Sequence, residues 1–156
     1  MRNKNNFFKA ITTWIILVII VISVSAYFVL NETWIGPIFI LMGLLSLLLL
    51  KSFKIKIETV YPDLVFGAID NGVLIFAAVL GGAYAGVAGA IIGGAAGNTL
   101  TDGIGGLFEG HVAQNQRKYK IDNSRTPLST MLGKITGCLF GAGAGLILVW
   151  FIRMVI

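Results

Sequence analysis

The sequence predicts an all-α integral membrane protein, a polytopic bundle of about five transmembrane helices. Three observations predict this class. Of the 156 residues, 56% are hydrophobic and only 12% are charged, whereas an ordinary soluble domain carries about 25% charged residues. The mean hydropathy is +0.88. Several apolar stretches reach the ~20 residues that a helix needs to cross the hydrocarbon core of a bilayer.

The first two spans are predicted to form a tight helical hairpin. Residues 10–30 are long enough to cross, Asn31-Glu32-Thr33 interrupts the apolar run, and residues 34–50 provide a second, shorter span. The first stretch is longer than the core of a usual signal peptide, so we expect it to be retained as a span. We assign residues 1–56 to this N-terminal hairpin and residues 57–156 to a glycine-rich transmembrane core.

The core is predicted to add three spans. Residues 63–110 are apolar for long enough to cross twice, with a turn near 81–83, and the last span covers about residues 132–152. If the 63–110 region is partly re-entrant, the number of spans falls to four. Between the hairpin and the core, residues 52–59 (SFKIKIET) alternate apolar and charged side chains, a period that suits a strand or an interfacial ribbon.

The basic residues predict how the chain is oriented. All except Arg153 form three clusters: before the first span, after the second, and between the fourth and fifth. By the positive-inside rule all three are cytoplasmic, so an even number of crossings separates each cluster from the next. We therefore expect a cytoplasmic N-terminus, and the absence of an Arg/Ser-rich transit segment favours a bacterial inner membrane. The clusters are Arg2, Lys4, Lys9; Lys51, Lys54, Lys56; and Arg117, Lys118, Lys120, Arg125, Lys134.

Small residues recur at every fourth position in two series. Because lipid supplies no hydrophobic force between helices, such residues promote association by letting backbones approach closely. We therefore predict that the fourth and fifth spans pack tightly, within one subunit or between subunits of a homo-oligomer. The first series is Gly82, Gly86, Ala90, Gly94, Asn98, Asp102, Gly106 and Gly110, and the second is Gly133, Gly137, Gly141 and Gly145.

Polar residues interrupt the third and fourth spans: Asp70 and Asn71 in one, Asn98, Thr101 and Asp102 in the other. We expect both aspartates at the same depth, in the cytoplasmic half of the membrane. A carboxylate at the centre of a membrane helix costs at least about 2.5–3.5 kcal/mol. Three interpretations stay open: one aspartate is protonated, the oxygens bind a hard cation, or the carboxylates hydrogen-bond backbone N–H groups near the glycines. Nearer the cytoplasmic rim, Glu109 and Lys134 are placed to form an interfacial salt bridge.

The spacing of these residues resembles a known family. The pattern Gly67-x-x-Asp70-Asn71, then Gly97-Asn98-x-x-Thr101-Asp102-x-x-Gly105, a later glutamate, and Leu132-Gly133-Lys134-x-x-Gly137 resembles the transmembrane protein sixty-five family of mitochondrial inner-membrane proteins and bacterial relatives. The resemblance covers about residues 60–150. That family is associated with mitochondrial sodium–calcium exchange. The resemblance implies that Asp70, Asn71, Asn98, Thr101 and Asp102 form a cation-handling constellation, with Thr101 where the family has a serine.

Two functions follow from these observations. The first is the handling of a cation (calcium, sodium or a proton) by an oligomeric membrane protein, with no cofactor other than a bound cation. The alternative is a non-enzymatic membrane anchor or sensor, as in bacterial stress or anti-phage defence systems, whose loop 111–131 holds a cytosolic protein through Arg117, Lys118, Lys120 and Arg125.

Other classes lack the required residues. The chain has one histidine and one cysteine, and it shows no nucleophile–base pair or phosphate-binding loop, so we do not expect an enzyme. The net charge of +5 belongs to the flanks of the spans and does not indicate nucleic-acid binding.

Overall fold

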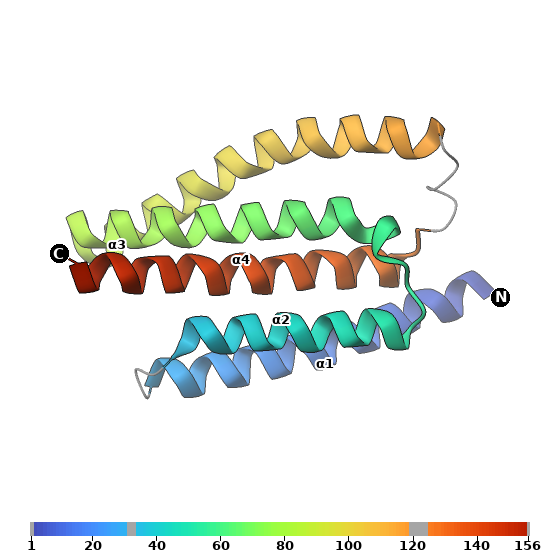
Figure 1. Cartoon of the computed structure of the whole chain (residues 1–156), viewed down its shortest axis with the longest axis horizontal. Helices are drawn as coiled ribbons and strands as arrows, with labels where there is room; N and C mark the ends of the chain where they lie inside the picture. Colours follow the sequence, from blue (N-terminus) through green and yellow to red (C-terminus); the bar gives the residue numbers. More distant parts are fainter. Residues whose placement is uncertain (1, 31–33, 119–124, 156) are drawn as a thin grey trace.

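The chain folds into four α-helices in a computed structural model that describes residues 2–30, 34–118 and 125–155 (Figure 1). The helices are α1 (Arg2–Leu30), α2 (Ile35–Ser52), α3 (Ile57–Lys118) and α4 (Pro127–Val155), and no strand occurs within the described ranges. All four are long and apolar enough to cross a membrane. The predicted all-α class is thus confirmed, with four such helices in place of about five.

The difference lies in α3, which folds back on itself. Ala85 (φ −137°, ψ 25°) and Gly86 (φ 60°, ψ −143°) leave the helical conformation, and the residues on either side run antiparallel, side by side (Figure 1). We call residues 57–84 the first arm and residues 87–118 the second arm. The predicted turn at 81–83 is a few residues too early, because the reversal uses Gly86, whose positive φ a glycine adopts without steric cost.

The two arms of α3 meet through backbone at glycine. A Cβ atom on Gly89 would lie 2.0 Å from the carbonyl oxygen of Gly81, and one on Gly93 would lie 2.2 Å from the carbonyl oxygen of Ala77. Farther from the turn, the ring of Phe66 occupies the space where Gly105 lacks a side chain. Residues four apart along the second arm therefore contact residues about four apart along the first arm, in the reverse order. This register determines which polar side chains face one another.

The other side of the first arm packs against α4. A Cβ on Gly137 or Gly141 would lie 2.1 Å from the carbonyl oxygen of Leu64 or Ala68, respectively. Gly133 and Gly145, one turn beyond at each end, face Val60 and Gly72 of the same arm. The partners advance together along both helices, so α4 and the first arm are parallel, as Figure 1 shows. Within one chain the fifth span therefore packs on the third and not on the fourth, because the second arm lies on the far side of the first. Packing of the fourth and fifth spans between subunits stays a prediction.

The small-residue face of the second arm also differs from the predicted one. The face that contacts the first arm contains Gly89, Gly93, Gly97, Thr101 and Gly105. In the predicted series, Gly86 forms the turn, Asp102 and Gly106 are exposed, and a Cβ on Gly106 would meet no atom within 4 Å. A Cβ on Gly82 or Gly94 would approach Ala90 or Ala78 no closer than 3.3 Å or 3.5 Å, respectively. Two neighbouring faces of the second arm carry small residues at every fourth position. The position of the turn determines which of these faces is buried against the first arm.

On the opposite side of α4 lies α2. Gly36 and Gly43 accommodate Ile147 and Phe140 of α4, and the buried hydroxyls of Ser46 and Thr136 form a 2.6 Å hydrogen bond. By contrast, among the side chains of α1 that are described (residues 7–28), Ala10 is the one buried hydrophobic residue. The order of packing is therefore α2, α4, first arm, second arm (Figure 1), and α1 contacts α4 as well as α2.

The segment expected to be a strand or ribbon is a helix C-terminus. The N–H of Ile55 donates to the carbonyl of Leu50 (2.9 Å), and the N–H of Lys54 donates to that of Lys51 (3.0 Å). Lys54 has φ 56°, and Ile55 packs against Leu50. These are the features of a Schellman motif, which ends α2 and satisfies its last carbonyl groups. Residues 52–59 thus comprise the end of α2, a turn at 53–54 and the start of α3 instead of an extended chain.

The predicted loop 111–131 is shortened from both ends. α3 continues to Lys118, and α4 begins at Pro127. The start of α4 is capped reciprocally: the N–H of Ser129 donates to Thr126 Oγ1 (3.1 Å), and the N–H of Thr126 donates to Ser129 Oγ (2.8 Å). Proline is favoured at the first helical position because it has no N–H to leave unpaired.

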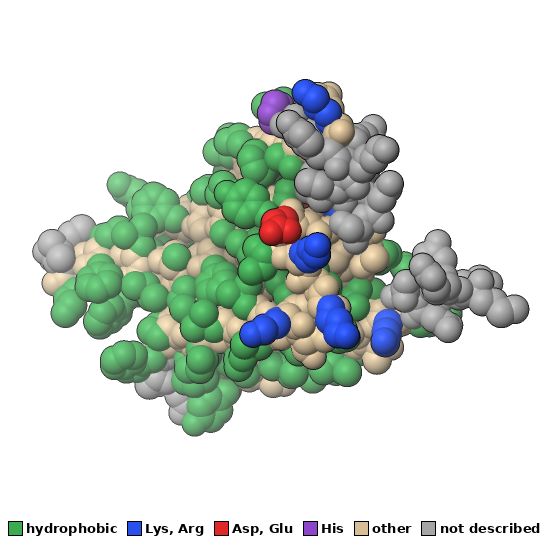
Figure 2. Space-filling model, turned by 45° about the vertical axis from the view of Figure 1, so that its right-hand side comes forward, with side chains coloured by type: hydrophobic (Ala, Val, Ile, Leu, Met, Phe, Trp, Pro, Cys, Tyr) green, Lys and Arg blue, Asp and Glu red, His purple; other side chains and the backbone are tan. Residues whose placement is uncertain are grey.

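One end of the molecule collects the basic side chains. The start of α1, the end of α2, both ends of α3 and the start of α4 lie together at the right of Figure 1. Figure 2 shows Lys and Arg side chains gathered on this end, which we call the basic end. Its described basic residues are Lys9, Lys51, Lys54, Lys56, Lys118 and Arg125.

Candidate functional site

The α3 hairpin brings Asp70 of the first arm against Thr101 of the second. Thr101 Oγ1 donates a hydrogen bond to Asp70 Oδ1, and Thr101 is only 3% exposed. The same hydroxyl oxygen lies 3.1 Å from the carbonyl oxygen of Gly97 and 3.0 Å from that of Asn98. A hydroxyl carries one hydrogen, so it serves one of these three acceptors at a time. Asp70 is the acceptor that links the two arms.

The position of Thr101 explains why a hydroxyl lies there. On this face of the second arm, Gly97 and Gly105 precede and follow Thr101 by one turn, and both permit close approach of the first arm. Thr101 is the member of the series that carries a side chain, and the residue opposite it carries a carboxyl group. At the level of Thr101 and Asp70, the two arms therefore meet through a polar pair of side chains instead of through backbone packing at glycine.

Asn71, next to Asp70, faces a different neighbour. Its Nδ2 donates to the carbonyl oxygen of Cys138 in α4 at 3.2 Å. Successive helical residues point about 100° apart, so Asp70 and Asn71 can reach two helices on different sides of the first arm. Together they connect the first arm to the second arm and to α4.

Asn98 and Asp102 form a separate pair on the second arm. Asn98 Nδ2 donates to Asp102 Oδ2 at 2.9 Å, and Asp102 is exposed. Because Asp102 follows Thr101 directly, it lies at the level of Asp70 but on another face of its helix. The same arm exposes Leu100 and Ile104 by more than 60%. Asp102 thus lies on an apolar surface that the described part of the chain leaves uncovered.

The predicted five-residue constellation is therefore divided. Asp70 contacts Thr101, Asn98 contacts Asp102, and Asn71 contacts α4. Within the described residues, no group of three or more His, Cys, Asp or Glu side chains is placed to hold a metal ion. The Thr101 hydroxyl lies beside the Asp70 carboxylate, and the carbonyl oxygens of Gly97 and Asn98 lie beside that hydroxyl. Neutral oxygens of these kinds, together with a carboxylate, are ligands that hard cations accept.

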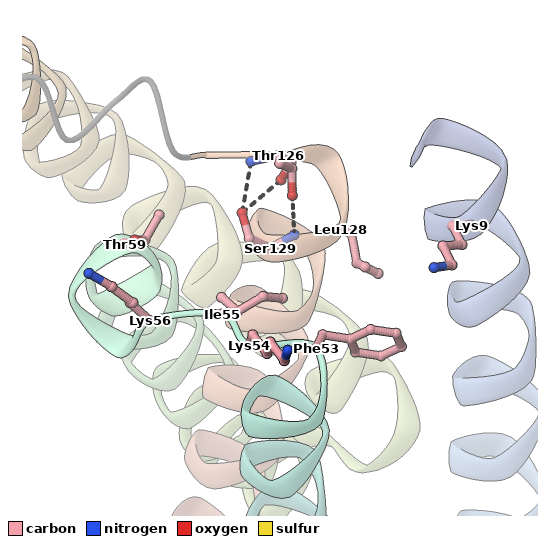
Figure 3. A pocket seen from close by; sticks show the side chains of 9 residues that line it. All are labelled: Lys9, Phe53, Lys54, Ile55, Lys56, Thr59, Thr126, Leu128 and Ser129. Atoms are coloured by element: carbon pink, nitrogen blue, oxygen red, sulfur yellow. Dashed lines mark hydrogen bonds between the residues drawn. The ribbon is translucent and has the colours of Figure 1, made fainter. Parts of the chain in front are cut away.

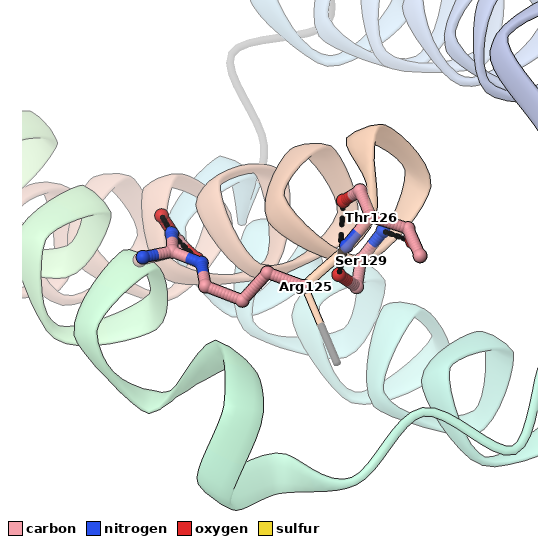
Figure 4. A network of polar contacts seen from close by, with 4 residues as sticks. Arg125, Thr126 and Ser129 are labelled. Atoms are coloured by element: carbon pink, nitrogen blue, oxygen red, sulfur yellow. Dashed lines mark hydrogen bonds and ion pairs between the residues drawn. The ribbon is translucent and has the colours of Figure 1, made fainter. Parts of the chain in front are cut away.

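A buried ion pair at the basic end is absent from the sequence prediction. Arg125 Nη2 lies 2.8 Å and 2.7 Å from the two carboxylate oxygens of Asp63, which is 2% exposed. Figure 4 shows the Arg125 side chain extending from beside the Thr126–Ser129 cap toward α3. The contact joins the start of α3 to the start of α4. An aspartate directly after a proline at the edge of a span was the available sequence signal.

Arg125 was predicted to bind a cytosolic partner, and the structure gives it this intramolecular contact. Of the other residues predicted for that role, Lys118 is exposed at the end of α3. The side chains of Arg117 and Lys120 lie outside the part of the chain that is described.

Lys134 also has an aromatic neighbour. Its ammonium lies 4.9 Å from the centroid of the Phe66 ring, a cation–π distance. The side chain of Glu109, its predicted partner, lies outside the described residues. Phe66 thus contacts α4 through Lys134 and the second arm through Gly105.

No protein-family model, curated protein or solved structure matches this chain.

Proposed function

We propose that the protein is a small integral membrane protein that handles a cation or a proton at the Asp70–Thr101 contact. The observation that supports this function is a carboxyl group in the middle of an apolar helical hairpin, hydrogen-bonded to a buried hydroxyl of the other arm. Ionisable side chains within membrane helices are costly and usually mark ion or proton pathways. The resemblance to the transmembrane protein sixty-five family points to the same chemistry.

The proposal places both arms of α3 across the membrane. Residues 57–84 would extend over about 42 Å at 1.5 Å per residue, which exceeds the ~30 Å hydrocarbon core. The second arm runs back beside the first, so the chain would cross five times. The basic end would face the cytoplasm by the positive-inside rule, in a bacterial inner membrane.

The Thr101 hydroxyl suits a site that gains and loses a positive charge. When Asp70 is ionised and no cation is bound, the hydroxyl hydrogen stabilises the carboxylate. When a cation or proton neutralises Asp70, the hydrogen can turn to the carbonyl oxygen of Gly97 or Asn98, at 3.1 and 3.0 Å. The hydroxyl oxygen then presents a lone pair toward Asp70. A single side chain can thus complement both states of the carboxyl group.

Asp102 supports a homo-oligomeric form of the protein. Its carboxyl group is exposed on the second arm at the level of Asp70, where a lone chain would place it against lipid. A second copy covering this face would supply polar neighbours, since polar residues between membrane helices commonly bond across the interface.

Ion flux into proteoliposomes tests the proposal. With the purified protein reconstituted, uptake of Ca²⁺, Na⁺ or H⁺ should be lost in Asp70→Asn, reduced in Thr101→Val and retained in Thr101→Ser. Thr99→Val is the matched control, because the Thr99 hydroxyl is exposed and bonds only the carbonyl of Ala95 in its own helix. Unchanged flux of all three ions in Asp70→Asn would remove the site assignment.

The gathering of basic side chains at one end (Figure 2) supports the alternative function, an anchor or sensor for a cytosolic protein. This alternative predicts a stoichiometric partner in a detergent pull-down. The partner should be lost when Lys118 and Lys120 are replaced by glutamine and kept when Asp70→Asn removes the carboxylate. Flux that depends on Asp70 together with no such partner would contradict it.

A further inference from the structure

A pocket at the basic end is formed by three segments that are distant in the sequence. The first segment is Lys9 of α1. The second, residues 53–59, joins α2 to α3 and includes the start of α3, and the third, residues 126–129, is the start of α4 (Figure 3). Its volume is about 350 Å³, within the range of ligand pockets. The full lining is Lys9, Phe53, Lys54, Ile55, Lys56, Thr59, Thr126, Leu128 and Ser129.

The charge of this pocket is of one sign. Three lysines line it and no acidic residue does. Figure 3 shows the ammonium of Lys9 pointing toward Phe53 and Leu128, while Lys56 extends away from Lys9. Within the described residues, neither Lys9 nor Lys54 forms an ion pair. The pocket therefore concentrates positive charge that no described carboxylate neutralises.

The start of α4 adds hydrogen-bonding groups and a further positive potential. Thr126 Oγ1 accepts the N–H of Ser129, so its own hydroxyl hydrogen is directed elsewhere. The N-terminus of a helix carries a partial positive charge of about +0.5. The N–H groups of Thr126 and Ser129 are used in the cap and Pro127 has none, so the terminus contributes this potential and the Thr126 hydroxyl, while the lysines supply the charge that attracts a phosphate. An oxyanion with several acceptor oxygens is the ligand that complements this set.

The other lining residues indicate what carries the phosphate. Phe53, Ile55 and Leu128 give the pocket an apolar side, which inorganic phosphate would leave uncovered. The pocket lies where α2 ends and where α3 and α4 begin. In a membrane-spanning protein these helix ends lie at the level of the lipid headgroups, where basic pockets between helices bind anionic headgroups.

Lys54 occupies a backbone position that is unfavourable for a residue with a side chain. Lys54 has a positive φ of 56° at the position of the Schellman motif that usually carries glycine. A lysine there carries a conformational cost of about 1–2 kcal/mol relative to glycine. Glycine would serve the fold at least as well at this position. Binding of a ligand by the lysine charge gives a reason for lysine at position 54.

We propose that this pocket binds the phosphate of an anionic phospholipid headgroup, with Lys9, Lys54 and the start of α4 contacting the phosphate and Phe53 and Leu128 contacting the lipid's apolar part. The proposal depends on membrane embedding and is independent of the Asp70–Thr101 site.

Native mass spectrometry of the delipidated protein, titrated with phosphatidylglycerol, tests the proposal. The double variant Lys9→Gln/Lys54→Gly should bind phosphatidylglycerol roughly 30-fold more weakly, at the strength typical of two basic side chains near an anionic membrane surface. Lys54→Gly is suited to the test because glycine keeps the backbone conformation. Lys51→Gln is the matched control, one turn away on α2 and outside the pocket lining. Circular dichroism should show equal helicity for all variants.

Two further probes separate the sources of the phosphate. Phosphatidylcholine, which has a phosphate but no net charge, should bind wild type and double variant equally weakly. Inorganic phosphate at the same concentration should not displace phosphatidylglycerol. An equal loss in Lys51→Gln, or no loss in the double variant, would overturn the pocket. Lysine-dependent binding of inorganic phosphate without binding of phosphatidylglycerol would overturn the assignment of a lipid as the ligand.

Discussion

At the scale of single residues, the polar contact between the two arms of α3 depends on one side chain, Thr101, in a face that otherwise consists of glycines. Thr101 lies in a face of glycines, and its hydroxyl reaches Asp70 on the other arm. The residue types of this site could be predicted from the sequence. Which of them meet could not, because a change of one residue along a helix turns the side chain by about 100°. Asp70 therefore contacts Thr101, while the neighbouring Asp102 points elsewhere.

Replacing Thr101 should separate the polar contribution from the packing contribution. Thr101→Val keeps the shape but removes the donor to Asp70, so we expect a loss of about 1 kcal/mol, typical of a hydrogen bond between membrane helices. Thr101→Ser should lose less, because the hydroxyl remains. Reversible unfolding by SDS in mixed micelles measures both. A Thr99→Val control that loses as much as Thr101→Val would show that the contact with Asp70 contributes nothing.

The Asp63–Arg125 pair predicts an asymmetric response to mutation. Arg125→Ala leaves a carboxylate that is 2% exposed without this guanidinium, whereas Asp63→Ala leaves an arginine that is 23% exposed. Breaking a buried pair by removing one partner costs about 3–5 kcal/mol. We expect that range for Arg125→Ala and a smaller loss for Asp63→Ala, measured in the same unfolding assay. Equal losses would contradict the difference in burial.

At the scale of helices, glycine has two different roles that a sequence series does not distinguish. Four of the five glycines of α4 face the first arm, and their spacing was the signal; the fifth, Gly143, faces Ile40 and Gly36 of α2. On the second arm two faces offer small residues at steps of four. The one that packs was not recognisable, because it is determined by the turn at Ala85-Gly86.

A pair of alanine substitutions distinguishes the two roles. A Cβ on Gly137 would lie 2.1 Å from the carbonyl oxygen of Leu64, whereas one on Gly106 would meet no atom within 4 Å. Gly137→Ala should therefore destabilise the protein by roughly 1–3 kcal/mol, as over-packing does. Gly106→Ala should be neutral or stabilise by up to about 1 kcal/mol through helix propensity. Thermal unfolding in detergent compares them, and similar midpoints would contradict the assigned packing.

At the scale of the whole molecule, composition and run length determined the helical class and the presence of membrane-length helices. The order of packing could not be obtained in the same way. The first arm lies between α4 and the second arm (Figure 1), a neighbour relation that hydropathy does not contain. The predicted loop was too long for a related reason, because polar residues such as His111 continue α3 as far as Lys118.

Accessibility of single cysteines tests the proposed five crossings. In a Cys138→Ser background, Tyr84→Cys next to the turn of α3 should react with a membrane-impermeant maleimide added to intact cells, since Tyr84 is 91% exposed. Lys54→Cys and Lys118→Cys at the basic end should react only after the cells are opened. Protection of Tyr84→Cys in intact cells would indicate a re-entrant hairpin instead of two crossings.

The contact between the arms of α3 also restricts which insertions and deletions this helix can accept during evolution. Since steps of four residues on the two arms meet in opposite directions, inserting one residue after Gly86 would turn the whole second arm by about 100°. Such an insertion would remove Thr101 from Asp70 and expose the glycine face. Insertions or deletions should be tolerated only when they add or remove about one full turn from both arms together. Relatives of this chain should therefore differ in hairpin length by whole paired turns, with the Asp70–Thr101 level unchanged.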